Sequence, residues 1–230
     1  ADTIVVDKTG TLTYATPTGA AVVPFGGHDE AEMLRLAACL EEHYPHSMAN
    51  AVVAEAKRHG LTHEEYHSQV QYVVAHGISS MVEGKKVIIG SAHFVFEDEG
   101  CRIPEGEQPK FDALPAAYSQ LYLCIDGELA AVICIHDPLR REAREAVRAL
   151  HESGFANVVM MTGDNRRTAE AVAAEVGVDA VYAEVLPEDK AAFIRQEKAK
   201  GYTVLMVGDG VHVTPALELA DEGIDIASGA

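Results

Sequence analysis

Tryptophan is absent from this 230-residue chain, aromatic residues make up only 6% of it, and cysteines number four. The cysteines form no CxxC pair and no dense framework, so we expect reduced thiols in a cytosolic setting. No uninterrupted apolar run approaches the roughly 18–20 residues that span a bilayer. The first residues also lack the basic region of a signal peptide, so the sequence predicts no targeting segment.

Positive charge is also scarce, because 18 lysines and arginines face 36 aspartates and glutamates, for a net charge of −18. So acidic a chain is not expected to bind nucleic acid or an anionic membrane surface directly. Acidic clefts suit divalent cations, although a solvated acidic surface is the commoner reason for such a charge. The apolar share of 48% supports a buried core, and the length fits one large domain or two modest ones.

The heptapeptide that begins at Asp7 follows an apolar, β-branched run, Thr3–Val6, which predicts a buried strand. Gly10 breaks this pattern, so Asp7 is expected where the strand ends, beside the ligand crevice of an open α/β sheet. A carboxylate there can act as a nucleophile or a metal ligand. Thr9 and Thr11 can donate hydrogen bonds to a phosphate. The alternative for an isolated aspartate at this position is an ordinary turn.

From Asp137 onward, helix and strand patterns alternate. Such alternation predicts a parallel sheet of the doubly wound type, which the strand at residues 3–6 must join. One domain therefore comprises residues 1–19 and 135–230, with residues 20–134 inserted into it. The predicted helices cover 140–153, a stretch ending at Val176, and 188–200, and the predicted strands cover 158–161, 181–184 and 202–207.

The insertion is predicted to be an α+β module with an antiparallel sheet. Proline and glycine between residues 17 and 27 indicate a linker, and a loop is expected over 97–109. Glu83-Gly84 and Asp126-Gly127 are typical of tight hairpin turns. The predicted helices cover 30–42 and 47–59, and the predicted strands cover 69–75, 79–82, 86–89, 121–125 and 128–135.

Three further polar residues follow predicted strands and are expected to converge on Asp7 at one edge of the sheet. Thr162 offers a hydroxyl, Lys190 offers a positive charge to developing oxyanions, and Asp209 offers a second carboxylate for a magnesium ion. Each signal is weak alone, since a lysine shortly after a proline usually just begins a helix. Their order after successive strands makes the set specific.

The Asp7 heptapeptide, DKTGTLT, resembles the phosphorylation signature of P-type ATPases, and the chain resembles the cytoplasmic catalytic unit of their heavy-metal (type IB) branch. The strand-end residues likewise resemble the motifs of the haloacid-dehalogenase-like superfamily, which includes these ATPases. The resemblance implies that Asp7 attacks the γ-phosphate of ATP and that Mg²⁺ is held by Asp7, Asp209 and the Thr9 carbonyl. It assigns to catalysis Asp7, Lys8, Thr9, Thr11, Thr162, Gly163, Asp164 and Lys190.

The same resemblance makes residues 20–134 a nucleotide-binding domain, in which His46 is expected to stack on adenine. Ser47 replaces the family's proline after that histidine, and Ala75 replaces the first of its nucleotide-contacting glycines. Asp137 and Arg140 resemble the family's hinge motif, and Asp164 is expected to face the nucleotide or the hinge. The full set assigned to nucleotide binding is Glu41, His46, Ala75, Gly77, Gly90, Asp137 and Arg140.

The last motif departs from the family pattern Gly-Asp-Gly-x-Asn-Asp. His212 stands at the asparagine and Val213 at the second aspartate, whereas Thr214 onward resumes the pattern. The missing carboxylate normally helps to order the magnesium site, so this substitution is expected to weaken metal binding. A nucleotide-binding module with impaired catalysis therefore remains an alternative.

A second alternative is a soluble phosphatase with a cap domain. Phosphatases of the superfamily usually carry an aspartate acid/base two residues after the nucleophile, where this chain has Thr9, which favours an ATPase.

The HExxH pattern at His63–His67 also suggests a zinc protease. That chemistry needs a sustained helix and a third ligand, which the flanking Gly60 and the following strand do not favour.

By resemblance, membrane segments would precede and follow this stretch, so we expect the soluble part of a longer heavy-metal or other divalent-cation transporter at the cytoplasmic face of a membrane. Its expected partners are ATP, the transmembrane and actuator domains of the same protein, and the transported cation, with no nucleic acid. Membrane residues would set the identity of the ion, which this sequence leaves open.

Overall fold

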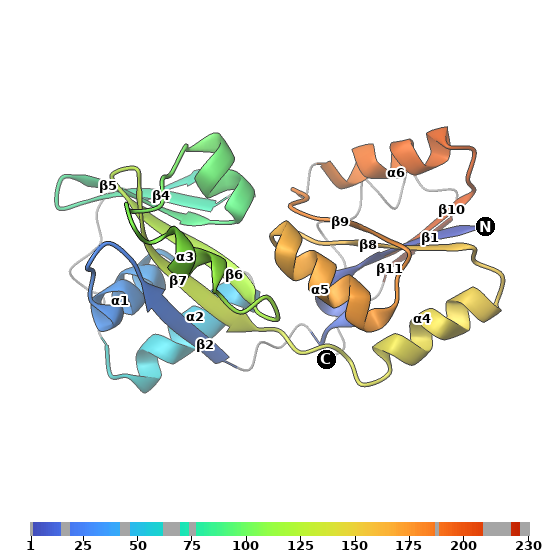
Figure 1. Ribbon diagram of the computed structural model, residues 1–230, viewed down its shortest axis with the longest axis horizontal. Coiled ribbons are helices and arrows are strands. Elements are labelled where there is room, and N and C mark those ends of the chain that lie inside the picture. The colour runs from blue at the N-terminus through green and yellow to red at the C-terminus, as the bar shows by residue number, and fades with distance from the viewer. Residues whose placement is uncertain are drawn as a thin grey trace. The chain divides into compact units, whose positions relative to one another are not determined.

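The computed structural model describes residues 2–14, 19–41, 47–61, 70–73, 77–186, 189–208 and 222–225. The chain divides into two compact units, which Figure 1 shows as separate folds. Unit 1 comprises Ala1–Thr16 and Asp137–Ala230, and unit 2 comprises Pro17–His136. The predicted boundaries at residues 19 and 135 compare with 16 and 137 in this division. No helix within the described ranges is long and apolar enough to cross a membrane.

Unit 1 is built on a five-stranded parallel sheet in the order β11-β10-β1-β8-β9. The first strand of the chain is central, because β1 pairs on one side with β8 and on the other with β10. All five residues of β1 are buried, as its β-branched sequence predicts. The strand bounds are Thr3–Asp7 (β1), Asn157–Met161 (β8), Ala180–Tyr182 (β9), Val204–Gly208 (β10) and Glu222–Asp225 (β11).

Helices cover both faces of this sheet (Figure 1), which is the predicted doubly wound arrangement. Apolar residues of α4 (Ala143–Glu152) and α5 (Arg166–Val176) pack with Ile4 and Val6 on one face. On the other face, α6 (Lys190–Ala199) packs against the sheet through Ile194, which lies with Val5 in a second cluster. The alternating side chains of one buried strand thus serve both layers.

Unit 2 is built on a six-stranded antiparallel sheet in the order β2-β7-β6-β5-β4-β3. Both predicted tight turns are confirmed. In each, two successive residues have positive φ, 50° and 79° at Glu83-Gly84 and 47° and 79° at Asp126-Gly127. The strand bounds are Gly19–Pro24 (β2), Val70–Val73 (β3), Gly77–Val82 (β4), Lys85–Gly90 (β5), Ser119–Ile125 (β6) and Glu128–His136 (β7).

The two predicted helices of unit 2 are confirmed as α1 (Glu30–Glu41) and α2 (Ser47–Arg58), and apolar residues of both pack on one face of the sheet. The Asp29 carboxylate caps α1 by accepting from the amide of Glu32 at 3.0 Å. The opposite face is covered by η3 (His93–Asp98) and α3 (Gln108–Asp112), as Figure 1 shows. The predicted α/β fold with an α+β insertion is therefore confirmed.

Several local predictions were wrong. The segment predicted as a linker forms β2, because its Ala-Ala-Val-Val core can pair as an edge strand and Pro24 falls at its last residue, where proline is tolerated. The loop predicted over 97–109 is shorter in the structure, because η3 extends to Asp98 and α3 begins at Gln108. The helix predicted from Arg140 begins at Ala143, and β11 was not predicted at all.

Candidate active site

Asp7 ends the central strand of unit 1 and leads into a tight loop, η1 (Lys8–Leu12). The loop turns at Gly10, whose φ of +81° lies in the region that favours glycine. Its closure uses Thr13, whose hydroxyl accepts from the Gly10 amide at 3.1 Å and whose own amide donates to the carbonyl of Lys8 at 3.1 Å. The position of Asp7 therefore follows from a buried strand and a cross-braced loop.

Lys190 reaches Asp7 from α6, which packs on the face of the sheet opposite α4 and α5. It is the first residue of α6, and its Nζ lies 2.9 Å from Oδ2 of Asp7, with each side chain 10% exposed. The two residues are 183 positions apart in sequence, and the topology brings them together at the carboxyl edge of the sheet. At so small an exposure the ammonium neutralises charge at Asp7 with little screening by solvent.

Thr162 lies at the same edge, because Asp7 is paired in register with Met161, the residue before it. Its side chain is buried, and its hydroxyl accepts from the amide of Asp164 at 3.1 Å. The Thr162 amide donates to the carbonyl of Tyr182 on β9 at 3.0 Å, which fixes the loop after β8. Gly163 faces no tight contact, since an added Cβ would lie 3.5 Å from the nearest atom.

A second ion pair, between Lys8 and Asp164, joins the loop that follows β1 to the loop that follows β8. Nζ of Lys8 lies 2.5 Å from Oδ2 of Asp164, and the side chains are 3% and 11% exposed. Sequence reasoning placed Asp164 toward the nucleotide or the hinge. In the structure its carboxylate accepts from Lys8, so both residues hold the loops at the edge of the sheet in place.

Breaking this pair should strongly destabilise unit 1. Asp164→Asn is expected to lower the free energy of unfolding by about 3–5 kcal/mol, because the buried Lys8 ammonium loses the carboxylate charge 2.5 Å away. The double variant Lys8→Met/Asp164→Asn should recover part of that loss, since neither member of this pair is then charged. Urea titration of the wild type, of the single variants Lys8→Met and Asp164→Asn, and of the double variant measures the loss and the recovery.

The matched control is an exposed ion pair in the same unit. Arg166 and Glu170 lie 3.5 Å apart with side chains 59% and 60% exposed. Glu170→Gln should therefore change stability by less than about 1 kcal/mol. Equal effects at Asp164 and Glu170 would contradict a structural role for the buried pair.

Arg140 holds the loop that follows Asp7 through two hydrogen bonds to its backbone. Its Nε donates to the carbonyl of Thr11 at 3.0 Å, and a terminal nitrogen donates to the carbonyl of Gly10 at 3.3 Å. The guanidinium also lies 5.3 Å from the ring centroid of Tyr14. Sequence reasoning grouped Arg140 with the nucleotide contacts and missed both Tyr14 and the bracing by Thr13, although Thr13 belongs to the same heptapeptide.

The loop also presents an unsatisfied donor. Oγ1 of Thr11 is buried and, within the described part of the chain, has no hydrogen-bond partner. A buried hydroxyl without a partner costs free energy, so its satisfaction by a ligand oxygen would be favourable. This observation fits a phosphate group beside Asp7.

Helix α6, which delivers Lys190, is anchored to β9 by a buried carboxylate. Glu197 is 3% exposed and accepts hydrogen bonds from the Tyr182 hydroxyl and, at 3.0 Å, from Nζ of Lys200. Burial and the hydrogen bond to Glu197 raise the pKa of Tyr182, so this phenol stays protonated as a donor at neutral pH. The anchor fixes the helix at whose first residue Lys190 stands.

Within the described residues, no three His, Cys, Asp or Glu side chains gather as a metal site. Of the ligands predicted for magnesium, the Asp7 carboxylate and the Thr9 carbonyl belong to the described loop, and Asp209 lies outside the described residues. Carboxylate and carbonyl oxygens are the hard donors that magnesium prefers, so the ligands that are described fit this ion.

In unit 2, two of the glycines predicted to contact nucleotide come together. Gly77 and Gly90 are directly paired across β4 and β5. A Cβ at Gly77 would lie 2.5 Å from both the Ile89 carbonyl oxygen and the Phe94 ring, so packing alone requires a glycine there. Glu41 is buried at the end of α1, whereas His46 and Ala75 lie outside the described residues. Asp137 is buried at the start of the second segment of unit 1.

Comparison with known proteins gives consistent results. Residues 1–221 match the profile of the haloacid dehalogenase-like hydrolase family. The chain is 39% identical to the copper-transporting ATPase 2 of Rhizobium meliloti (strain 1021), covering 100% of this chain and 27% of that protein. It is 38% identical to the copper-exporting P-type ATPase of Bacillus subtilis (strain 168), covering 99% and 28%. The chain thus spans little more than a quarter of these relatives.

A solved structure is similar over nearly the whole chain. The catalytic domain of the CPx-ATPase CopB-B, from a study of its conformational changes upon nucleotide binding, matches with a TM-score of 0.72 at 28% identity. The match covers 97% of this chain and 77% of that one. At this identity and coverage, the likeness extends to both units.

Proposed function

This chain belongs to the haloacid dehalogenase-like hydrolase family and, within it, to the catalytic units of heavy-metal P-type ATPases, and from this premise we propose that ATP phosphorylates it at Asp7. The observation that carries the proposal is the contact between Asp7 and Lys190. A carboxylate at the end of the central strand, 2.9 Å from a buried ammonium, supports this role, because a carboxylate can attack phosphorus while the ammonium opposes the charge on the phosphoryl oxygens.

In the proposed step, an Asp7 carboxylate oxygen forms a bond to the γ-phosphorus of ATP while the bond from that phosphorus to the bridging oxygen breaks. The products are an aspartyl-phosphate and ADP, so no proton transfer is required. Lys190 opposes the charge on the transferring oxygens, and the hydroxyls of Thr11 and Thr162 donate to them. Lys8 and Asp164 hold the two loops in position.

The residue at Thr9 supports a long-lived intermediate. A threonine cannot act as the acid/base that would protonate a leaving group or activate water against the acyl phosphate. This favours a phosphorylated ATPase intermediate over the turnover of phosphate esters by a soluble phosphatase with a cap domain.

We propose Mg²⁺ and ATP as the cofactors. Asp7, the carbonyl of Thr9 and Asp209 would hold the ion, which when bound supplies charge neutralisation between the phosphate oxygens and the nucleophile. His212 and Val213 follow Asp209 in the sequence, all three outside the described residues, and the missing second aspartate is expected to weaken this site.

Unit 2 is proposed as the nucleotide-binding domain. Gly77 and Gly90 are paired on adjacent strands, and Glu41 lies at the end of α1 just before the segment that contains His46. Ala75 belongs to the same proposed site. Asp137 and Arg140 are proposed as the hinge motif. Arg140 donates to the carbonyl of Thr11, in the loop that follows Asp7.

The transported ion is proposed from the names of the relatives. Those compared above are described as copper-transporting and copper-exporting, so we propose that the longer protein moves a heavy-metal cation across a membrane, with these units at the cytoplasmic face. Its transmembrane and actuator domains would then be the intramolecular partners. Nothing in the composition favours nucleic acid, since the net charge is −18.

The test is incubation of the chain with γ-labelled ATP and Mg²⁺, followed by acid quench and electrophoresis at acidic pH. Acid-stable label that is released by hydroxylamine is expected, because an acyl phosphate reacts with that nucleophile. Turnover of small phosphate esters is measured in parallel, and robust turnover without label would favour the phosphatase.

The Val213→Asp variant separates an intact fold with a disabled motif from a wrong assignment. Label in Val213→Asp but not in the wild-type chain would mean that the last motif alone has lost its function. If both proteins are folded and bind ATP but neither is labelled, the proposal is overturned and the binding module with impaired catalysis is left.

A further inference from the structure

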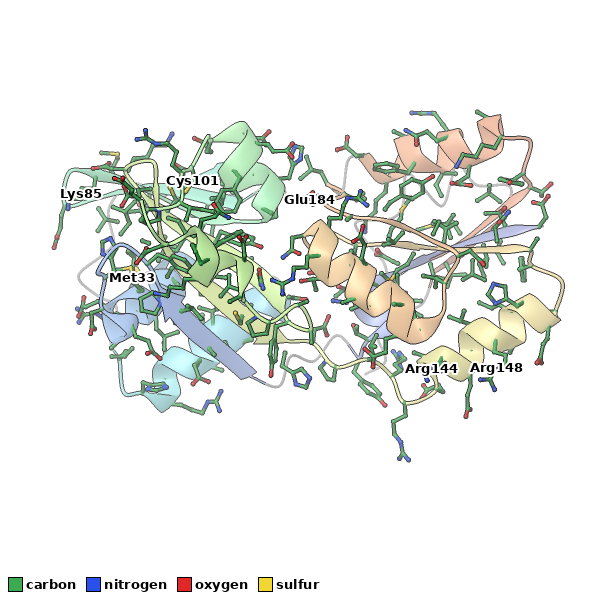
Figure 2. The ribbon with its side chains drawn as sticks, viewed as in Figure 1. Met33, Lys85, Cys101, Arg144, Arg148 and Glu184 are labelled. Atoms are coloured by element: carbon green, nitrogen blue, oxygen red, sulfur yellow. The ribbon has the colours of Figure 1, made fainter. Side chains whose placement is uncertain are left out.

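Unit 1 carries a second cationic feature, separate from Lys8 and Lys190. A groove of about 350 Å³ lies between the start of α4 and the C-terminal end of α5, and it is lined by four arginines together with Glu145 and Glu175. Two of these arginines, Arg144 and Arg148, are labelled on α4 in Figure 2. Their spacing of four residues places them on one side of the helix. The four arginines are Arg140, Arg141, Arg144 and Arg148.

Three guanidinium groups of the groove, those of Arg141, Arg144 and Arg148, carry a charge that the described residues leave unpaired. In the described part of the chain none of them forms an ion pair, and Arg144 instead donates from Nε to the carbonyl of Glu175 at 2.8 Å. Like charges four residues apart on a helix repel each other, so the cluster is unfavourable by itself. In a chain with twice as many acidic as basic residues, such a cluster indicates an external anion.

The chemistry of the groove selects the class of ligand. Guanidinium groups bind phosphate oxygens through paired hydrogen bonds, and the volume of about 350 Å³ is near the lower end of the roughly 300–1,000 Å³ seen for small-molecule pockets. The net charge of −18 repels an extended polyanion or an anionic membrane at long range. We propose that the groove binds a compact phosphate-bearing anion, held by Arg141, Arg144 and Arg148.

This site would adjoin the catalytic loop without including Asp7. Arg140 lines the groove with its neighbours and donates to the carbonyls of Gly10 and Thr11 in the loop that follows Asp7. The remaining arginines are available to a ligand while Arg140 keeps those bonds. Binding in the groove is therefore independent of the proposed phosphorylation and can be measured without it.

Inorganic pyrophosphate is the probe, titrated calorimetrically without Mg²⁺ because the metal would sequester it. Saturable binding is expected, and Arg141→Gln/Arg148→Gln should weaken it by about tenfold or more, since two charge-assisted contacts are lost. Neither side chain bonds to the described part of the protein, so the variant should fold. Arg195→Gln, an exposed arginine on α6 across the sheet, is the matched control and should bind as the wild type does.

Three results would overturn the proposal. These are no saturable binding to the wild-type chain, equal binding by Arg141→Gln/Arg148→Gln, and loss of binding in Asp7→Asn, which would place the anion at the phosphorylation site. Sedimentation with phosphatidylcholine vesicles, with and without phosphatidylserine, tests the lipid source. Capture by the acidic vesicles without pyrophosphate binding would replace the small anion with a membrane surface.

Discussion

Asp7→Asn is expected to abolish the acid-stable label from γ-labelled ATP. The amide that replaces the carboxylate is a far weaker nucleophile, and it also removes the charge that pairs with Lys190 at 2.9 Å. Because most of the proposed nucleotide contacts lie in unit 2, ATP binding should persist in this variant. The measurement is the label at fixed ATP and Mg²⁺, normalised to the folded fraction and accompanied by a direct ATP-binding titration.

Glu170→Gln is the control for this experiment. It makes the same carboxylate-to-amide change in the same unit, on the exposed side of α5, and should leave labelling unchanged. Full labelling of Asp7→Asn would show that another residue accepts the phosphoryl group and would sink the assignment of the nucleophile. Loss of label together with loss of ATP binding would point instead to a folding defect.

The parts of the fold that were predictable have strong local signals. The β-branched run before Asp7 indicated a buried strand, and the helix predicted to end at Val176 does so as α5, with Gly177 as its left-handed C-cap. The meeting of Asp7 and Lys190 was predictable without local signal, because the carboxyl ends of parallel strands share one edge of a sheet. The shared edge of the sheet thus predicts this contact although the two residues are 183 positions apart in sequence.

Other contacts could not be predicted because they depend on side-chain placement in three dimensions. Nothing in the sequence distinguishes an Asp164 that faces a ligand from one that pairs with Lys8, since both require only a loop after the strand. Arg140 was grouped with the nucleotide by resemblance, whereas its bonds go to the carbonyls of Gly10 and Thr11. Every residue has a backbone carbonyl, so the sequence does not indicate which carbonyl an arginine will bond, and only the structure shows such hydrogen bonds.

The β2 segment illustrates a different limit. Its proline and glycine suggested a linker, yet Ala20 to Val23 pair with β7 along the edge of the sheet. Turn-forming residues at both ends of a short strand give the same composition as a loop, and only the availability of a partner strand decides between them. The β11 strand was missed for another reason, because four residues carry too little periodicity.

Lys190→Met is expected to slow phosphorylation of Asp7 by about 10²–10³-fold, the usual effect of removing one preorganised electrostatic contact to a developing charge. The side chain is 10% exposed, so water cannot replace the ammonium effectively. ATP affinity should change little, since the expected loss lies in the transition state. The measurement is the initial rate of label formation by quenched flow at saturating ATP, with Arg195→Met on the same helix as control.

A second substitution separates charge from position at this site. Lys190→Arg keeps the positive charge, but its planar fork and longer reach cannot place one donor at 2.9 Å from Asp7 in the same way. If Lys190 acts mainly through its charge, the arginine variant should recover part of the rate that methionine loses. If it acts by holding Asp7 in place, both variants should be equally slow. A wild-type rate in a folded Lys190→Met protein would remove Lys190 from the mechanism, and the contact with Asp7 would then be structural only.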